Sequence, residues 1–195
     1  MKARFRIIAA GTALAVLTVM GAFAQKKTNP STNSANRSTN SANRMTSSST
    51  FATKAAEGGL AEVKLGNLAK DHASSQEVKN FGQKMVDDHS KANEELKGIA
   101  AAKNINLPDS MSSADQATYD KLAKLNGTQF DKAYMADMVK DHRKDVNEFK
   151  HEAATGTDAE LKAFAQKTLP TLQNHLQLAE TTYNTVKGEK QQTQK

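Results

Sequence analysis

The stretch VKNFGQKMVDDHSKANEELKGI, residues 78–99, decides the fold. Its apolar residues recur at steps of three and four, which is the period of one face of an α-helix and not of a strand. That face consists of Val78, Phe81, Met85, His89, Ala92, Leu96 and Ile99. The stretch therefore predicts a long amphipathic helix that buries one side and carries a histidine in the middle of that side.

The same period recurs on both sides of this stretch. We expect long helices at about 50–72, 75–103, 129–154 and 158–187 and a shorter helix at about 114–126. Two capping boxes support the helix starts, and they are formed by Ser74 with Glu77 and by Thr157 with Glu160. The sequence predicts an all-α fold, a ferritin-like four-helix bundle with a short crossover helix.

The first 24 residues have the pattern of an export signal. Three basic residues precede an apolar run from Ile7 to Met20, and Ala22-Phe23-Ala24 follows as a small-residue cleavage site. An uncleaved membrane anchor is the alternative, but the apolar run is at the lower limit of the ~17–25 residues that a spanning helix needs. We expect a mature chain that starts at Gln25, has no transmembrane span, and is periplasmic, associated with the outer membrane or secreted.

The polar stretch 25–49 contains the heptapeptide STNSANR twice in tandem, at 31–37 and 38–44. With almost no hydrophobic side chains it predicts a disordered linker, and a surface-attachment stalk is the alternative. Residues 50–188 form the predicted bundle, and residues 189–195 form a polar tail. The absence of cysteine excludes disulfides, iron–sulfur clusters and a thiol nucleophile.

The net charge of +6 comes from the N-terminal part of the chain. Seven of the 27 basic residues precede residue 45 and all 21 acidic residues follow it, so residues 45–195 have a net charge of −1. A nearly neutral domain lacks the basic surface that binding to a polyanion requires. We therefore expect no nucleic-acid partner, and the sequence indicates neither a protein partner nor an oligomeric state.

Each of the four apolar faces carries one polar residue that can bind a metal, near the middle of its helix: Glu62, His89, His142 and His175. If the helices that carry His89 and His142 run parallel, these two histidines lie at the same level. We expect all four side chains to converge in one layer. Two interpretations stay open: a site for zinc, iron, copper or nickel, or a polar layer whose members satisfy each other without metal.

Neighbouring residues allow further predictions. Asp145, three residues after His142, is expected to orient that histidine by a hydrogen bond. Asp88 and Asp141 are expected to be surface charges, because neighbours on a helix point apart. The pair Gly58-Gly59 either gives access to the polar layer or allows a neighbouring helix to approach closely.

No catalytic residue can be identified. The Glu-x-x-His spacing of di-iron proteins occurs only at Glu148 to His151, off the apolar face, which disfavours a ferritin-type redox enzyme. The sequence has no glycine-rich phosphate loop. The predicted function is an exported bundle that binds a metal or small ligand through its Glu/His layer. The alternative is a non-catalytic structural or interaction protein of the cell envelope.

Several motifs together resemble a bacterial exported family known as domain of unknown function 4142, which is grouped with ferritin-like bundles. They are AEVKLG (61–66), KMVDDHSKAN (84–93), FDKAY (130–134), MVKDH (138–142) and LPTLQNH (169–175). The resemblance covers about residues 51–187. It implies an exported, ferritin-like helical domain in the periplasm or outer-membrane fraction and no established activity.

Overall fold

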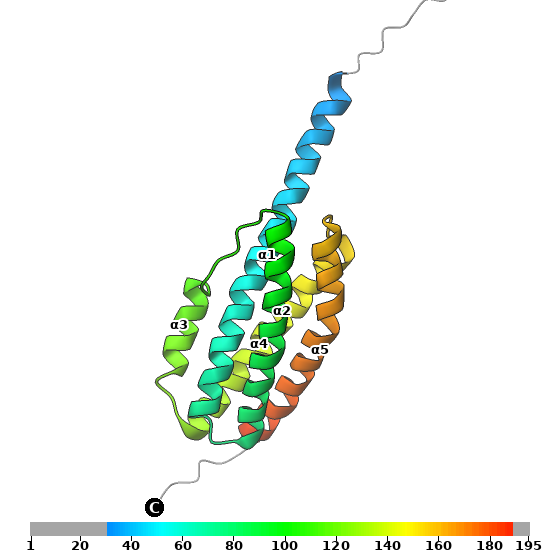
Figure 1. Ribbon diagram of the computed structural model, residues 1–195. Coiled ribbons are helices and arrows are strands. Elements are labelled where there is room, and N and C mark those ends of the chain that lie inside the picture. The colour runs from blue at the N-terminus through cyan, green and yellow to red at the C-terminus, as the bar shows by residue number, and fades with distance from the viewer. Residues whose placement is uncertain (1–30, 189–195) are drawn as a thin grey trace, which may run out of the picture.

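The computed structural model of the chain describes the backbone of residues 31–188 and the side chains of residues 47–188. The predicted signal peptide (1–24) and the predicted polar tail (189–195) lie outside the described residues. The described part contains helices and no strand, which confirms the predicted all-α bundle (Figure 1). The helices are α1 (Ser31–His72), α2 (Gln76–Ala102), α3 (Ser113–Leu122), α4 (Gly127–Thr155) and α5 (Ala159–Gly188).

Two helical hairpins make the bundle. Helices α1 and α2 form one hairpin and α4 and α5 form the other, with α2 packed against α5 and α1 against α4. The connection between the hairpins includes α3 and crosses the length of the bundle, so α2 and α4 run in the same direction (Figure 1). This is the condition under which His89 and His142 lie at the same level. Within residues 31–188, no helix has the length and apolar character that crossing a membrane requires.

The core consists of two apolar clusters, one toward each end of the bundle. One cluster includes Phe81, Phe130 and Met135, and the other includes Phe149 and Phe164. Along each of the four long helices, the residues of one cluster are separated from those of the other by a single buried polar position. These positions are Glu62, His89, His142 and His175. The polar residues therefore lie in one layer at mid-height.

Helices α1 and α2 approach each other closely at a pair of glycines. A Cβ atom on Gly66 would lie 2.5 Å from the carbonyl oxygen of Gly82, and a Cβ atom on Gly82 would lie 2.7 Å from that of Gly66. Backbone oxygens cannot move aside as flexible side chains can, so any larger residue would force the two helices apart.

The turn between α1 and α2 is fixed by a buried carboxylate of α4. Asp131 is fully buried and accepts hydrogen bonds from the backbone N–H groups of Ser74 and Ser75 and from the hydroxyl of Ser74. Ser74 therefore does not cap α2 as the sequence predicts, and Ser75 is the N-cap residue. At the start of α5 the sequence predicts Thr157 as the cap. The carboxylate of Asp158, one residue later, accepts from the backbone N–H of Leu161 instead.

Helix α1 begins earlier than the sequence predicts. The sequence predicts the start of this helix at about residue 50, whereas helical backbone begins at Ser31, and the first part of α1 projects beyond the end of the bundle (Figure 1). Residues 25–30 of the expected disordered linker lie outside the described residues. Extending an existing helix adds one hydrogen bond per residue and needs no new nucleus, so it does not require an apolar face. Ser48, near the predicted domain boundary, is buried and donates a hydrogen bond to Glu152 at 3.2 Å.

Candidate metal centre

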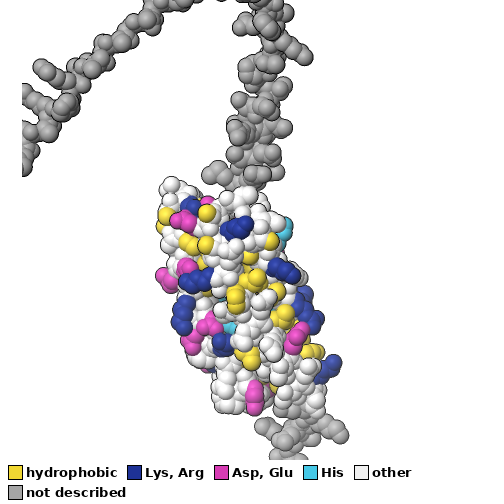
Figure 2. All heavy atoms as spheres, turned by 90° about the vertical axis from the view of Figure 1, so that its right-hand side faces the viewer, with side chains coloured by type: hydrophobic (Ala, Val, Ile, Leu, Met, Phe, Trp, Pro, Cys, Tyr) yellow, Lys and Arg dark blue, Asp and Glu magenta, His cyan; other side chains and the backbone are white. Residues whose placement is uncertain are grey.

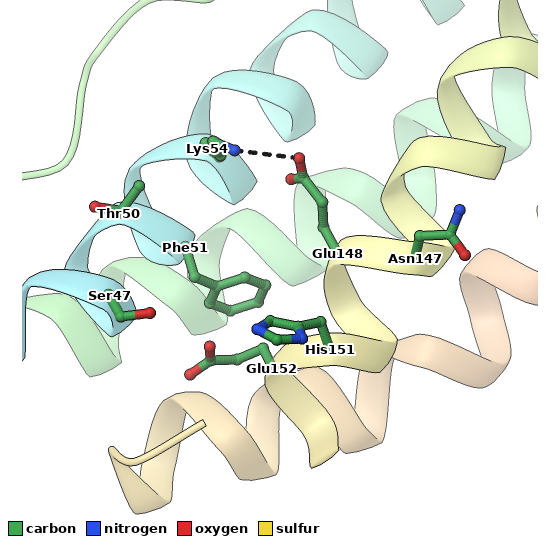
Figure 3. Close-up of a pocket in the computed structure, with 8 residues that line it drawn as sticks. All are labelled: Ser47, Thr50, Phe51, Lys54, Asn147, Glu148, His151 and Glu152. Carbon is green, nitrogen blue, oxygen red and sulfur yellow. Dashed lines mark hydrogen bonds and ion pairs between the residues drawn. The ribbon is translucent and has the colours of Figure 1, made fainter. Parts of the chain in front are cut away.

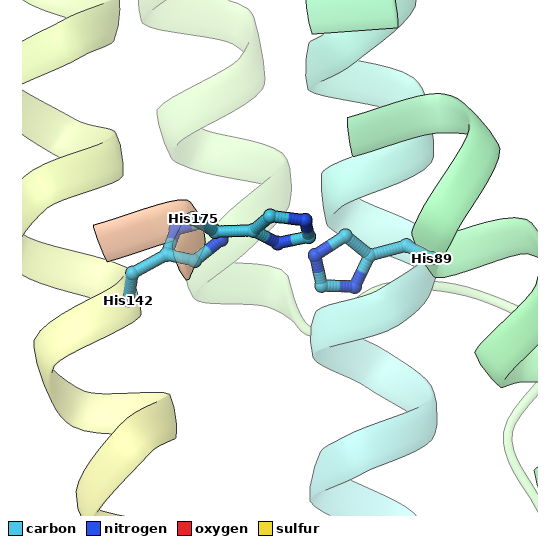
Figure 4. Close-up of side chains that lie close together, drawn as sticks. All are labelled: His89, His142 and His175. Carbon is cyan, nitrogen blue, oxygen red and sulfur yellow. The ribbon is translucent and has the colours of Figure 1, made fainter. Parts of the chain in front are cut away.

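Three of the four predicted polar residues bring nitrogen atoms together at mid-height. His89 of α2, His142 of α4 and His175 of α5 each offer one ring nitrogen, and these nitrogens lie within 4.8 Å of one another (Figure 4). The ring centroids are 5.4–5.8 Å apart. His142 and His175 are fully buried and His89 is 7% exposed. The rings come from both hairpins, so the cluster exists only when the hairpins are packed together.

Hydrogen bonds fix the tautomers of two of these rings. Nδ1 of His142 donates to the carbonyl oxygen of Met138 at 3.0 Å, and Nε2 of His175 donates to Oδ2 of Asp88 at 2.9 Å. A carbonyl and a carboxylate can only accept, and a neutral imidazole has one N–H and one lone pair. The lone pairs of His142 and His175 therefore lie on Nε2 and Nδ1, the two nitrogens without a hydrogen-bond partner.

The environment keeps the imidazoles neutral. Burial, with the neighbouring His175 as a second cause, lowers the pKa of His142 to about 3. Burial also lowers the pKa of His89 well below its ordinary value, and His142 and His175 act in the same direction as smaller causes. The pKa of His175 is lowered by burial too, although Asp88 opposes that shift. Neutral imidazoles are the form that binds metal ions.

Glu62 lies in the same layer but beside His142. Its Oε1 atom is 3.7 Å from Nδ1 of His142, the ring nitrogen that bonds to the Met138 carbonyl. Burial raises the pKa of Glu62 well above its ordinary value, and the nearby Asp141 and Asp145 raise it further. The cluster of converging donor atoms thus consists of three histidines, and Glu62 contacts one of them from another direction.

The partners that orient the rings differ from those predicted. Asp145 is expected to orient His142, but the carbonyl of Met138 accepts that hydrogen bond. Asp88 is expected to be a surface charge, but it accepts from His175 and also pairs with Lys84 at 2.9 Å. As expected for neighbours on a helix, Asp88 and His89 point in different directions, and the Asp88 side chain reaches His175 of α5. Burial, with Asp141 as a second cause, raises the pKa of Asp145 to about 8.

The layer does not satisfy its own hydrogen-bonding groups. Among the described residues, the buried side-chain atoms without a partner are Oε1 and Oε2 of Glu62, Nε2 of His89, Nε2 of His142, Nδ1 of His175 and the hydroxyl of Tyr134. An unpaired buried polar atom costs about 1–3 kcal/mol. A self-sufficient polar layer would avoid this cost, whereas a cation could accept the lone pairs of the three histidines together.

The donor set fits a transition metal ion. Metal–nitrogen bonds of 2.0–2.1 Å place the donors of a tetrahedral site about 3.4 Å apart. The three nitrogens lie within 4.8 Å of one another, which is about 1.4 Å more than that spacing. Hydrogen bonds from the far side of two rings, to Asp88 and to the Met138 carbonyl, are the usual support of metal-binding histidines.

Comparison with known proteins gives a family match and a match to a solved structure. A family model described as "Domain of unknown function (DUF4142)" matches residues 32–182. A crystal structure described as "putative secreted protein DUF305 from Streptomyces coelicolor" has a similar fold, with a TM-score of 0.63 and 17% sequence identity over 74% of this chain and 97% of that chain. No curated protein matches the chain. At this identity the crystal structure supports the fold alone.

Proposed function

Because the chain belongs to the DUF4142 family, as its motifs predict, and the description of that family names no activity, we propose a function from the site itself. The protein is an exported bundle that binds one transition metal ion through His89, His142 and His175. Two observations carry this proposal: the three buried histidines bring one ring nitrogen each within 4.8 Å of the others, and each of these rings has a buried nitrogen without a hydrogen-bond partner.

The chemistry of the donors narrows the class of metal. Imidazole nitrogen suits zinc, copper, iron and nickel, and three neutral histidines leave room for a further ligand on the ion. Glu62 is an ionisable group beside His142, and burial raises the pKa of its carboxyl well above its ordinary value. Asp88 and the Met138 carbonyl keep two of the rings in the tautomers that ligation needs.

Export and a ferritin-like relationship are further parts of the proposal. The basic residues, apolar run and Ala22-Phe23-Ala24 of the N-terminus support export, and the similar Streptomyces coelicolor protein is described as secreted. The single long crossover between α2 and α4 is the connectivity of ferritin-like bundles. Mass spectrometry of the mature chain tests export: Gln25 is the expected N-terminus, and an intact Met1 would contradict it.

Metal binding is tested on the chain from Gln25 after removal of metal with a chelator. Titration with Zn²⁺ and Co²⁺ is expected to give one ion per chain by elemental analysis, and His142→Ala should abolish stoichiometric binding. His151→Ala is the matched control, because His151 is exposed on the same helix. Absence of stoichiometric binding to wild type, or equal binding by His142→Ala, would refute the proposal and favour a purely structural layer.

A further inference from the structure

Two cavities share lining residues of α1 and α4. The outer one is an open surface pocket of about 610 Å³, and Phe51, Lys54, Glu148 and His151 are among the residues that line it (Figure 3). The inner one is a narrow cavity of about 20 Å³ that reaches His89. Lys54 and Glu148 line both cavities, and the Lys54 ammonium lies 3.3 Å from the Glu148 carboxylate. This ion pair therefore stands between the surface pocket and the inner cavity.

The two adjacent glycines of α1 have different roles. A Cβ atom on Gly59 would lie 2.0 Å from Oδ1 of Asn93, so this glycine makes room for a side chain of α2. A Cβ atom on Gly58 would meet nothing within 4 Å, although Gly58 lines the inner cavity. The absence of a side chain at Gly58 thus leaves open space on the path toward His89.

The size and walls of the inner cavity define what can occupy it. About 20 Å³ is enough for one water molecule, which needs roughly 10–15 Å³. Phe149, Phe164 and Leu172 make one part of the wall apolar, and Asp145 and Asn93 supply polar groups. Such a cavity holds one water molecule, and only a slender linear ion could take the place of that molecule.

We propose that the inner cavity carries a water molecule or a small anion to an open coordination position on the metal, with Lys54 and Glu148 at its entrance. This inference rests on the proposed metal binding. A metal ion held by three protein nitrogens keeps a position for an exogenous ligand. Since the Lys54 side chain is 53% exposed, it can swing into solvent and open the outer end.

Azide, a linear ion of three atoms, is the probe. Added to the Co²⁺-loaded protein, azide is expected to change the visible absorption spectrum at a saturable concentration. Gly58→Leu fills the cavity and should lower azide affinity at least tenfold while one Co²⁺ per chain is retained. Gly98→Leu is the matched control, because a Cβ atom at this exposed glycine of α2 also meets nothing within 4 Å. Lys54→Ala should raise the azide association rate several-fold in stopped-flow measurements.

The outcomes separate this inference from the proposed function. Failure of wild type to bind Co²⁺ refutes metal binding itself. Binding of Co²⁺ without a spectral response to azide overturns the open position alone. Azide affinity in Gly58→Leu equal to that in Gly98→Leu overturns the route. If Gly58→Leu does not fold by circular dichroism, Lys54→Ala decides, and an unchanged association rate overturns the role of the ion pair at the entrance.

Discussion

Replacing Asp88 by alanine tests whether the hydrogen bond to His175 prepares the metal centre. Asp88 accepts from Nε2 of His175 at 2.9 Å and so places the lone pair of that ring on Nδ1. Loss of such a partner typically lowers metal affinity 10–100-fold. This corresponds to about 1.4–2.7 kcal/mol of binding free energy. Without metal, the unpaired N–H of a buried ring should also lower the free energy of unfolding by about 1–3 kcal/mol.

Asp87→Ala is the control for this experiment. Asp87 precedes Asp88 on α2, is exposed, and accepts a hydrogen bond only from Gln83 in the described part of the chain. Both substitutions change helix propensity equally, so their difference isolates the contact with His175. Affinities for Co²⁺ are measured by competition with a chelator of known affinity, and stabilities by urea unfolding. If Asp88→Ala binds Co²⁺ within twofold of Asp87→Ala, His175 is not held by Asp88 for metal binding.

Three further predictions concern packing and pH. Leu172→Ala should lower the free energy of unfolding by about 2–5 kcal/mol in urea titration, because Leu172 is 2% exposed; no loss would contradict the assigned face of α5. Gly66→Ala should lower it by about 1–3 kcal/mol through the clash between α1 and α2, whereas Gly98→Ala should raise it by about 0.5–1 kcal/mol; equal effects would argue against close helix packing. His142 has a lowered pKa, so below pH 6.5 the unfolded chain takes up a proton before the folded one does. Between pH 6.5 and about 3, metal-free wild type should therefore lose stability relative to His142→Gln, by up to about 1.4 kcal/mol per pH unit; parallel stability curves would show that His142 is not buried in its neutral form.

The positions of the three histidines could be predicted because helix periodicity fixes the face of each residue. His89 and His142 follow similar motifs, and the parallel arrangement of α2 and α4 places them at one level. The partners of the rings could not be predicted in this way. Whether Asp88 reaches α5 depends on the packing of a different helix, and the face of His142 that Glu62 approaches depends on side-chain rotamers.

The sequence also left open the role of the glycine pair, and it placed the start of α1 at about residue 50. Gly58 and Gly59 are residues of the same type, but successive residues of a helix are rotated by about 100° about its axis. This rotation places Gly58 beside open space and Gly59 against Asn93. The composition of residues 25–49 shows that they contribute little apolar surface. Because a helix can extend outward from a packed bundle without an apolar face, composition does not predict where α1 begins. The structure places that start at Ser31.

The division of the histidines between the two hairpins has a mechanical consequence. His89 belongs to the first hairpin, while His142 and His175 belong to the second, so an ion bound to all three would tie together points of the chain that are far apart in sequence. At 3.3–3.6 Å per residue, the segment between His89 and His175 represents about 300 Å of contour length. A single molecule stretched from its two ends would release that length in two steps, because rupture of the bond to His89 or to His175 leaves the ion tying His142 to the other one.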